Sequence, residues 1–142
     1  MSIAKQIVRL AKVDLDGSKP ITIALSNIKG IGGSLASSIC NIHNIPKSTR
    51  IGNLSEEQIK QIEKTIENPQ QSNIPIFMIN RQKDFQTNKN MHIITSELKL
   101  TTDFDIKRLK KIKSYKGVRH ALGLPVRGQK TKAHFRTGKT LG

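Results

Sequence analysis

Apolar positions in the first part of the chain repeat with the spacing of amphipathic helices. One stretch has four apolar residues at positions i, i+3, i+4 and i+7, which is the pattern of a single helix face. These residues are Ile21, Ala24, Leu25 and Ile28. A second face begins after Ser34 and contains Leu35, Ile39 and Ile42. The glycine-rich segment 29–33 separates the two faces, so the pattern predicts two helices joined by a glycine hairpin.

The clearest helix start in the chain is the sequence Leu54-Ser55-Glu56-Glu57-Gln58-Ile59. Ser55 and Gln58 have the spacing of a capping box, in which each side chain bonds to the backbone N–H of the other residue. An apolar stripe follows, formed by Ile59, Ile62 and Ile66. Asn68-Pro69 should end this helix.

The composition changes in residues 69–101. A polar segment is followed by the apolar run IPIFMI, which Pro75 confines to a sheet edge or to a non-sheet segment. Asn88-Lys89-Asn90 then separates FQT from MHII, a spacing that is compatible with a small hairpin.

The N-terminal sequence MSIAKQIVRLAK is basic and contains no acid, as in a short organelle transit helix. Its apolar residues fit the buried side of a first strand or helix equally well, and we favour this structural interpretation. They are Ile3, Ile7, Val8 and Leu10, with Val13 just beyond.

The last third of the chain is strongly basic. Residues 105–142 contain twelve Lys and Arg and one acid, Asp105, so they hold +11 of the formal net charge of +15. Ile106, Leu109 and Ile112 recur on one side of a helix predicted from about Thr102 to His120, and basic residues cover the rest. Acids occur only in its first turn, so its later bases lack acidic neighbours along the helix.

The tail that follows Gly123-Leu124-Pro125 should have no regular structure. Residues 126–142 are rich in Gly, Thr, Lys and Arg, and Phe135 is their only aromatic residue. Such a segment cannot bury enough apolar surface to fold alone. We expect it to be disordered in the free protein and ordered on RNA or on a neighbouring protein.

Few other chemistries fit the composition. The single cysteine, Cys40, excludes an internal disulfide and a multi-cysteine zinc site. The four histidines show no i, i+3 or i+4 pairing, and no set of nucleophile, base and orienting residue is evident, so we expect no metal, no cofactor and no enzyme activity. No apolar run reaches the roughly 20 residues of a membrane span, so we expect a soluble protein with no membrane partner.

The charge distribution predicts a polyanionic partner, and nucleic acid is the most general one, since each phosphate neutralised releases condensed counterions. The glycine hairpin resembles a helix-hairpin-helix motif, in which backbone N–H groups approach phosphates at the start of the second helix. Its candidate residues are Lys29, Gly30, Gly32 and Gly33. These features predict a nucleic-acid-binding protein, and a helix-hairpin-helix DNA-binding module is one hypothesis that fits them.

Residues 123–140, GLPVRGQKTKAHFRTGKT, strongly resemble the universal small-subunit ribosomal protein of the head, numbered thirteen in bacteria and eighteen in eukaryotes. The resemblance covers nearly the whole chain, from about Ile7 to Gly142. It is supported by four further blocks: Ile28–Gly33, Leu54–Ile59, residues 74–85 and Ser114–His120. The block 74–85 is similar to the archaeal and eukaryotic branch, because bacterial members lack this insertion. Leu124-Pro125-Val126 has the bacterial spelling, which keeps a mitochondrial ribosome as the alternative to the cytoplasmic one.

The resemblance implies a mainly α fold: a helix-two-turns-helix domain with a small hairpin insertion, a long basic helix and an extended C-terminal tail. We divide the chain accordingly. The parts are residues 1–68 for the helical domain, 69–101 for the loop and hairpin insertion, 102–122 for the basic helix, and 123–142 for the tail threaded through rRNA.

The resemblance also implies the binding residues and partners. Besides the hairpin, rRNA contacts fall on the basic helix and the tail, at Lys107, Arg108, Lys110, Lys111, Lys113, Lys116, Arg119, His120, Arg127, Gly128, Lys130, Lys132, Arg136 and Lys139. The implied partners are small-subunit rRNA, the neighbouring head protein numbered nineteen in bacteria, a large-subunit protein at an intersubunit bridge, and peptidyl-site tRNA. The chain ends at Gly142, where many relatives continue with a short Lys-rich segment, and this departure bears on the tRNA contact.

Overall fold

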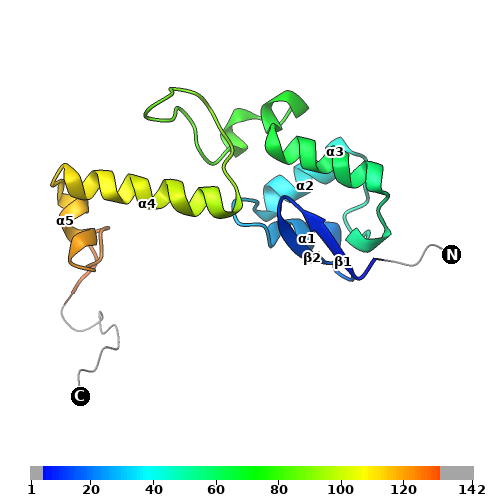
Figure 1. The fold of residues 1–142 in the computed structure, drawn as a ribbon, viewed down its shortest axis with the longest axis horizontal. Helices are drawn as coiled ribbons and strands as arrows, with labels where there is room; N and C mark the ends of the chain where they lie inside the picture. Colours follow the sequence, from blue (N-terminus) through cyan, green and yellow to red (C-terminus); the bar gives the residue numbers. More distant parts are fainter. Residues whose placement is uncertain (1–4, 132–142) are drawn as a thin grey trace, which may run out of the picture. The chain divides into compact units, whose positions relative to one another are not determined.

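The computed structural model describes residues 5–131 of the 142-residue chain. The chain divides into two compact units between Leu98 and Lys99. Most of the regular structure, which is mainly helical, lies in the first unit (Figure 1). The predicted mainly α fold is therefore confirmed. The division into four parts stays a prediction, and the tail beyond residue 131 lies outside the described residues.

The chain begins with a two-stranded antiparallel hairpin formed by β1 (Ile7–Leu10) and β2 (Val13–Asp16). The two residues between the strands, Ala11 and Lys12, both have positive φ, at 48° and 64°. This is the geometry of a tight turn whose twist matches that of the strands. Side chains alternate along β1, so that Val8 and Leu10 are buried whereas Ile7 is exposed. Of the apolar residues predicted to form a first strand or helix, Ile7, Val8 and Leu10 form a strand, Val13 begins the next strand, and Ile3 lies outside the described residues.

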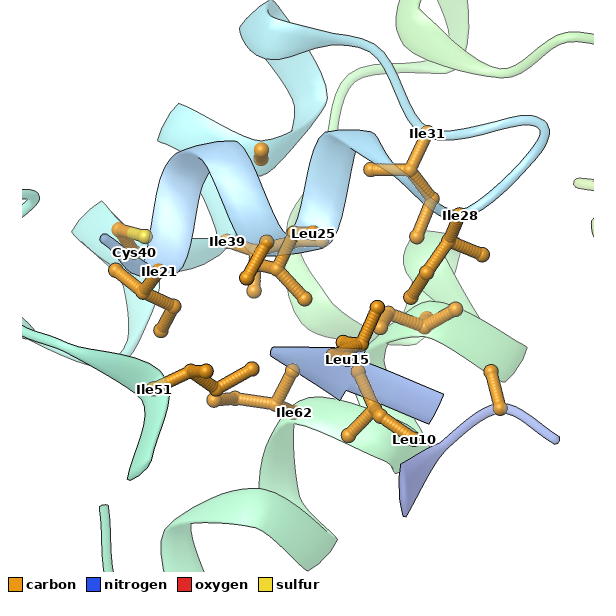
Figure 2. Packing of buried hydrophobic residues seen from close by; sticks show 14 of the residues in the cluster. Leu10, Leu15, Ile21, Leu25, Ile28, Ile31, Ile39, Cys40, Ile51 and Ile62 are labelled. Carbon is orange, nitrogen blue, oxygen red and sulfur yellow. The ribbon is translucent and has the colours of Figure 1, made fainter. Parts of the chain in front are cut away.

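Two short helices form the predicted helical hairpin. They are α1 (Ile21–Ser26) and α2 (Gly33–Ile42), which pack against each other. All four residues of the first predicted face are completely buried. Leu35 and Ile39 of the second face are also buried, whereas Ile42 lies at the end of α2 and is exposed. Figure 2 shows Ile21, Leu25, Ile28 and Ile39 packed with Leu10 and Leu15 of the β-hairpin.

The helix α3 (Glu56–Glu67) begins with the predicted capping box. The Ser55 Oγ accepts a hydrogen bond from the Gln58 backbone N–H at 3.3 Å, and the Gln58 Oε1 accepts from the Ser55 N–H at 3.1 Å. Ile62 and Ile66 point into the core, and Asn68 ends the helix. A 3₁₀ turn at Ile51–Asn53 (η1) precedes α3. The sequence pattern predicted both ends of this helix.

The insertion that follows α3 contains little regular structure. Two 3₁₀ turns occur at Pro69–Ser72 (η2) and Ile76–Met78 (η3), so the apolar run after Pro75 is a non-sheet segment, as predicted. Within the described residues the expected hairpin contains one isolated antiparallel bridge, between Arg81 and Met91. Side-chain hydrogen bonds to Asp84 shape this loop in place of a regular ladder.

The prediction of a single basic helix from Thr102 to His120 is wrong about where the helix starts and about its being unbroken. The structure has α4 (Thr95–Lys111) and α5 (Tyr115–Ala121) instead. Lys113 has a φ of 55°, which breaks the helix, and the Ser114 Oγ then accepts from the Gly117 N–H at 3.2 Å and caps α5. Ser114 is thus a helix start inside a continuous basic stretch.

Close packing joins α5 to the last turn of α4. A Cβ atom at Gly117 would collide with the backbone of Leu109 and Lys110, so only glycine permits this approach. Beyond α5, the Arg119 Nε donates to the Pro125 carbonyl at 2.9 Å. Within residues 122–131 the chain has no helix or strand. None of the helices in the described part is long and apolar enough to cross a membrane.

Candidate nucleic-acid interface

The glycines of the helical hairpin have different structural roles. Gly30 has a φ of +106°, and a Cβ atom there would lie 2.7 Å from the Ile93 carbonyl oxygen and 3.2 Å from the Ile94 Cα. The Lys29 carbonyl accepts a hydrogen bond from the Thr95 N–H at 2.8 Å. The backbone of Lys29–Gly30 therefore docks the end of the insertion onto the helical hairpin. Gly30 therefore has a structural role, because its lack of a side chain permits this close packing.

Gly32 and Gly33 face open space instead. Apart from its immediate neighbours along the chain, a Cβ atom at either position would find no protein atom within 4 Å. Gly32 has an extended backbone (φ −95°, ψ 172°) and precedes α2 at its N-cap. Because it has no side chain, it cannot accept from the first N–H groups of α2, which leaves them to an external acceptor. A phosphate oxygen is such an acceptor, and the exposed Lys29 adds a positive charge nearby in the sequence.

The basic residues of α4 and α5 are mostly exposed. Those exposed to solvent are Lys99, Lys107, Lys110, Lys111 and Lys116, together with Lys113 in the turn between the two helices, whereas Arg108, Arg119 and His120 are half-buried. Arg108 pairs with Asp105 at 3.9 Å. The Lys107 ammonium lies 5.6 Å from the centre of the Phe104 ring. At this distance a cation–π contact can hold the Lys107 side chain over the helix.

Counting charges shows how little of this basic surface can be neutralised within the unit. Residues 99–131 contain ten Lys and Arg but two acids, Asp103 and Asp105. Two carboxylates can neutralise at most two of these cations. A dense array of exposed cations on a helix attracts the phosphate backbone of a nucleic acid regardless of its sequence.

The first part of the tail continues this surface. Arg127 and Lys130 are exposed, and Gly128 has a φ of 76° with open space around it. Arg119 has a structural role in addition, through its bond to the Pro125 carbonyl. Three predicted site residues, Lys132, Arg136 and Lys139, lie outside the described residues.

Other reactive side chains belong to the core. Cys40 is completely buried, and burial raises the pKa of its thiol. His43 lies 3.0 Å from the Thr65 hydroxyl, and burial lowers its pKa. A search of residues 5–131 finds no group of three His, Cys, Asp or Glu side chains that could hold a metal ion.

The sequence pattern did not identify the loop 81–91 as a candidate binding surface. It presents Phe85, Lys83 and Lys89 to solvent around the buried Asp84 carboxylate. The signal was present in the sequence NRQKDFQTNKN, where an aromatic residue lies among bases and amides. The segment was interpreted as a hairpin, and this interpretation gave no reason to ask why an aromatic residue lies among bases and amides.

Comparison of the sequence with known proteins identifies the family of the chain. The family described as "Ribosomal protein S13/S18" matches residues 9–137, which include the glycine hairpin, both basic helices and part of the tail. The chain belongs to this family. The resemblance noted from the sequence is therefore confirmed.

Individual relatives agree along nearly their whole length. The small ribosomal subunit protein uS13 of Methanopyrus kandleri is 51% identical over 140 residues, which cover 97% of this chain and 93% of that protein. The uS13 protein of Staphylothermus marinus is 49% identical over 138 residues (97% and 91% covered). That of Methanobrevibacter smithii is 45% identical over 138 residues (97% and 94% covered).

These relationships establish a structural, non-enzymatic protein of the small ribosomal subunit. The relatives are archaeal, which agrees with the branch inferred from the insertion. They support a ribosome in the cytoplasm and give no support to the mitochondrial alternative.

Proposed function

We propose that this member of the S13/S18 family binds rRNA in the head of the small subunit by charge neutralisation. The excess of ten bases over two acids in residues 99–131 is the observation that carries the proposal. A second contact is proposed at the hairpin, where Gly32 and Gly33 leave the start of α2 accessible to a phosphate.

In this proposal the basic helices contact the sugar-phosphate backbone of the rRNA. Their exposed cations are lysines, which neutralise phosphates as flexible point charges. A structural protein needs this kind of contact, because it must hold an RNA shape rather than read a base sequence. The family assignment favours rRNA over the DNA partner of a helix-hairpin-helix module.

Removing two charges from α4 tests the proposal. In the Lys110→Gln/Lys111→Gln variant, log K for purified small-subunit rRNA should depend less steeply on log salt, by about 0.7–0.9 for each lost phosphate contact. The matched control is Lys60→Gln/Lys64→Gln, which removes two exposed lysines from α3. Filter binding at a series of salt concentrations measures both slopes. Equal slopes for the two double variants would show that the basic helix is not the binding surface.

We further propose an intersubunit bridge near the peptidyl-tRNA site. The resemblance to the family supports this proposal. It also supports a contact with the neighbouring head protein numbered nineteen in bacteria, which we propose as well. Small subunits that lack the chain should associate more weakly with large subunits, and adding the protein back should restore association on a sucrose gradient. Unchanged association without the protein would exclude a bridging role.

A further inference from the structure

The loop 81–91 has a fixed shape although it contains no helix or regular strand. Two backbone hydrogen bonds between Arg81 and Met91, of 3.2 Å and 2.8 Å, close its base. Inside the loop, the Asp84 N–H donates to the Lys89 carbonyl at 2.9 Å, and the Asn88 N–H donates to the Asp84 carbonyl at 2.7 Å. These bonds constrain both ends and the middle of the loop, so its exposed side chains start from defined positions.

The Asp84 side chain organises the tip of the loop. One oxygen accepts from the Arg81 Nε at 2.5 Å, and the other accepts from the backbone N–H groups of Gln86 and Thr87 at 3.2 and 3.1 Å. The Thr87 hydroxyl adds a further bond at 3.1 Å. The carboxylate is 7% exposed. Asp84 is the only acid of the loop, and Arg81 balances its charge internally, so the charges that face the solvent are positive.

The same folding presents an aromatic ring. Phe85 is 73% exposed although it directly follows the buried Asp84. Lys83 and Lys89 are exposed on either side of it in the sequence, together with amide side chains. An exposed phenyl ring contributes little hydrophobic stabilisation to a fold, because most of its apolar area stays in water. This arrangement suits an external partner that offers both a flat apolar surface and negative charge.

We propose that the loop 81–91 binds an unpaired nucleotide of rRNA, whose base stacks on Phe85 while Lys83 and Lys89 contact the flanking phosphates. An unpaired base fits better than a base pair, because the faces of paired bases are already covered by their neighbours in the helix. Nucleic acid fits better than an apolar protein surface, because bases combine a π face with adjacent phosphates. The proposal rests on the rRNA-binding function proposed above and adds a contact outside the glycine hairpin and the basic helices.

Four substitutions in the full-length protein separate stacking from other contacts. Phe85→Ala removes the ring, Phe85→Leu keeps apolar volume without a π face, and Phe85→Tyr keeps the face. Ile76→Ala is the control, because Ile76 lies in the same insertion, is 55% exposed and is absent from the residues that line the hollow beside Gly32. Filter binding to purified small-subunit rRNA at one salt concentration gives each dissociation constant.

The expected pattern is specific to stacking. Phe85→Ala and Phe85→Leu should bind about 5- to 100-fold more weakly, whereas Phe85→Tyr and Ile76→Ala should stay within about twofold of the wild type. Wild-type affinity for Phe85→Leu together with loss for Phe85→Ala would identify a general apolar contact and overturn the proposal. Wild-type affinity for all four variants would overturn it as well, while leaving the rRNA-binding function intact. A wild-type protein that does not bind rRNA would refute that function instead.

Discussion

Replacing Gly30 and Gly33 by alanine in turn should separate folding from binding within one short hairpin. At Gly30 the φ of +106° lies far from the region that residues with a side chain adopt, and the new Cβ would lie 2.7 Å from the Ile93 carbonyl oxygen. A left-handed backbone costs about 1–2 kcal/mol for a non-glycine residue. Relieving the overlap by moving the backbone at Ile93–Ile94 costs about a further 1–3 kcal/mol. We therefore expect Gly30→Ala to lose about 2–5 kcal/mol of stability.

Gly33→Ala should behave in the opposite way. Gly33 is the first residue of α2, and the added methyl group would find open space within 4 Å. Alanine is the better helix former by up to about 1 kcal/mol, so this variant should be as stable as the wild type or slightly more stable. Its rRNA affinity should nevertheless fall, because the methyl group stands where a phosphate must approach the first N–H groups of α2.

Urea unfolding followed by circular dichroism measures the two stabilities, and filter binding on purified small-subunit rRNA measures the affinities. For a domain of this size a loss of 2–5 kcal/mol corresponds to a Tm lower by about 10 °C or more. The reasoning is refuted if Gly30→Ala unfolds at the wild-type urea concentration, since neither the strain nor the overlap would then exist. Wild-type rRNA affinity for the folded Gly33→Ala protein would remove the hairpin from the binding surface.

Two further predictions concern the first unit. Ser55→Ala breaks the capping-box bond to Gln58 and should lower the stability measured by thermal unfolding by about 1 kcal/mol. Ser55→Asp should retain most of the wild-type stability, because aspartate also caps helices. Equal losses for both variants would exclude capping as the cause. Hydrogen bonds, that from Arg81 first, hold the pKa of Asp84 at about 2 against an ordinary 3.8. Because the pKa is lower in the folded state, the ionised carboxylate stabilises the loop, and this contribution is fully present at a pH above the unfolded-state pKa. It is lost as the pH falls from about 4 to about 2. The protection of the Gln86 and Thr87 amides, taken relative to the intrinsic exchange rate at each pH, should therefore fall in that window in the wild type but not in Asp84→Asn. Wild-type protection that is independent of pH would contradict the assigned network.

The parts of the fold that the sequence predicts are those governed by local chemistry. The capping box at Ser55 and the apolar faces of α1, α2 and α3 depend on residues within one or two turns of each other, so their spacing is visible in the chain. The break between α4 and α5 was missed for a related reason. Ile106, Leu109 and Ile112 keep helical spacing up to the break, and the cap signal at Ser114 lies among basic residues that fit a continuous helix.

The insertion and the hairpin glycines depend on contacts between distant residues. The shape of the loop 81–91 comes from one buried carboxylate and its donors, and no periodic pattern encodes such a network. Gly30 and Gly33 look alike in sequence, but only the structure shows that the insertion returns at Ile93–Ile94 to pack on Gly30. Sequence reasoning could identify the glycine hairpin as a candidate site but could not say which glycines serve the fold.

The distribution of apolar burial and charge differs between the two units and gives the second one a physical reason to need a partner. Every buried hydrophobic residue of the described chain lies between Val8 and Ile93, and α4 has no buried residue at all. The unit up to Leu98 has twelve Lys and Arg against eight acids, whereas the remainder has thirteen against two. Burial of apolar surface is the main term that opposes both conformational entropy and repulsion between like charges, and the basic unit has little of it. Neutralisation by phosphates reduces the repulsion and releases counterions in the same step. We therefore expect the first unit to fold by its own core, and the second to gain stability from the polyanion that we propose as its partner.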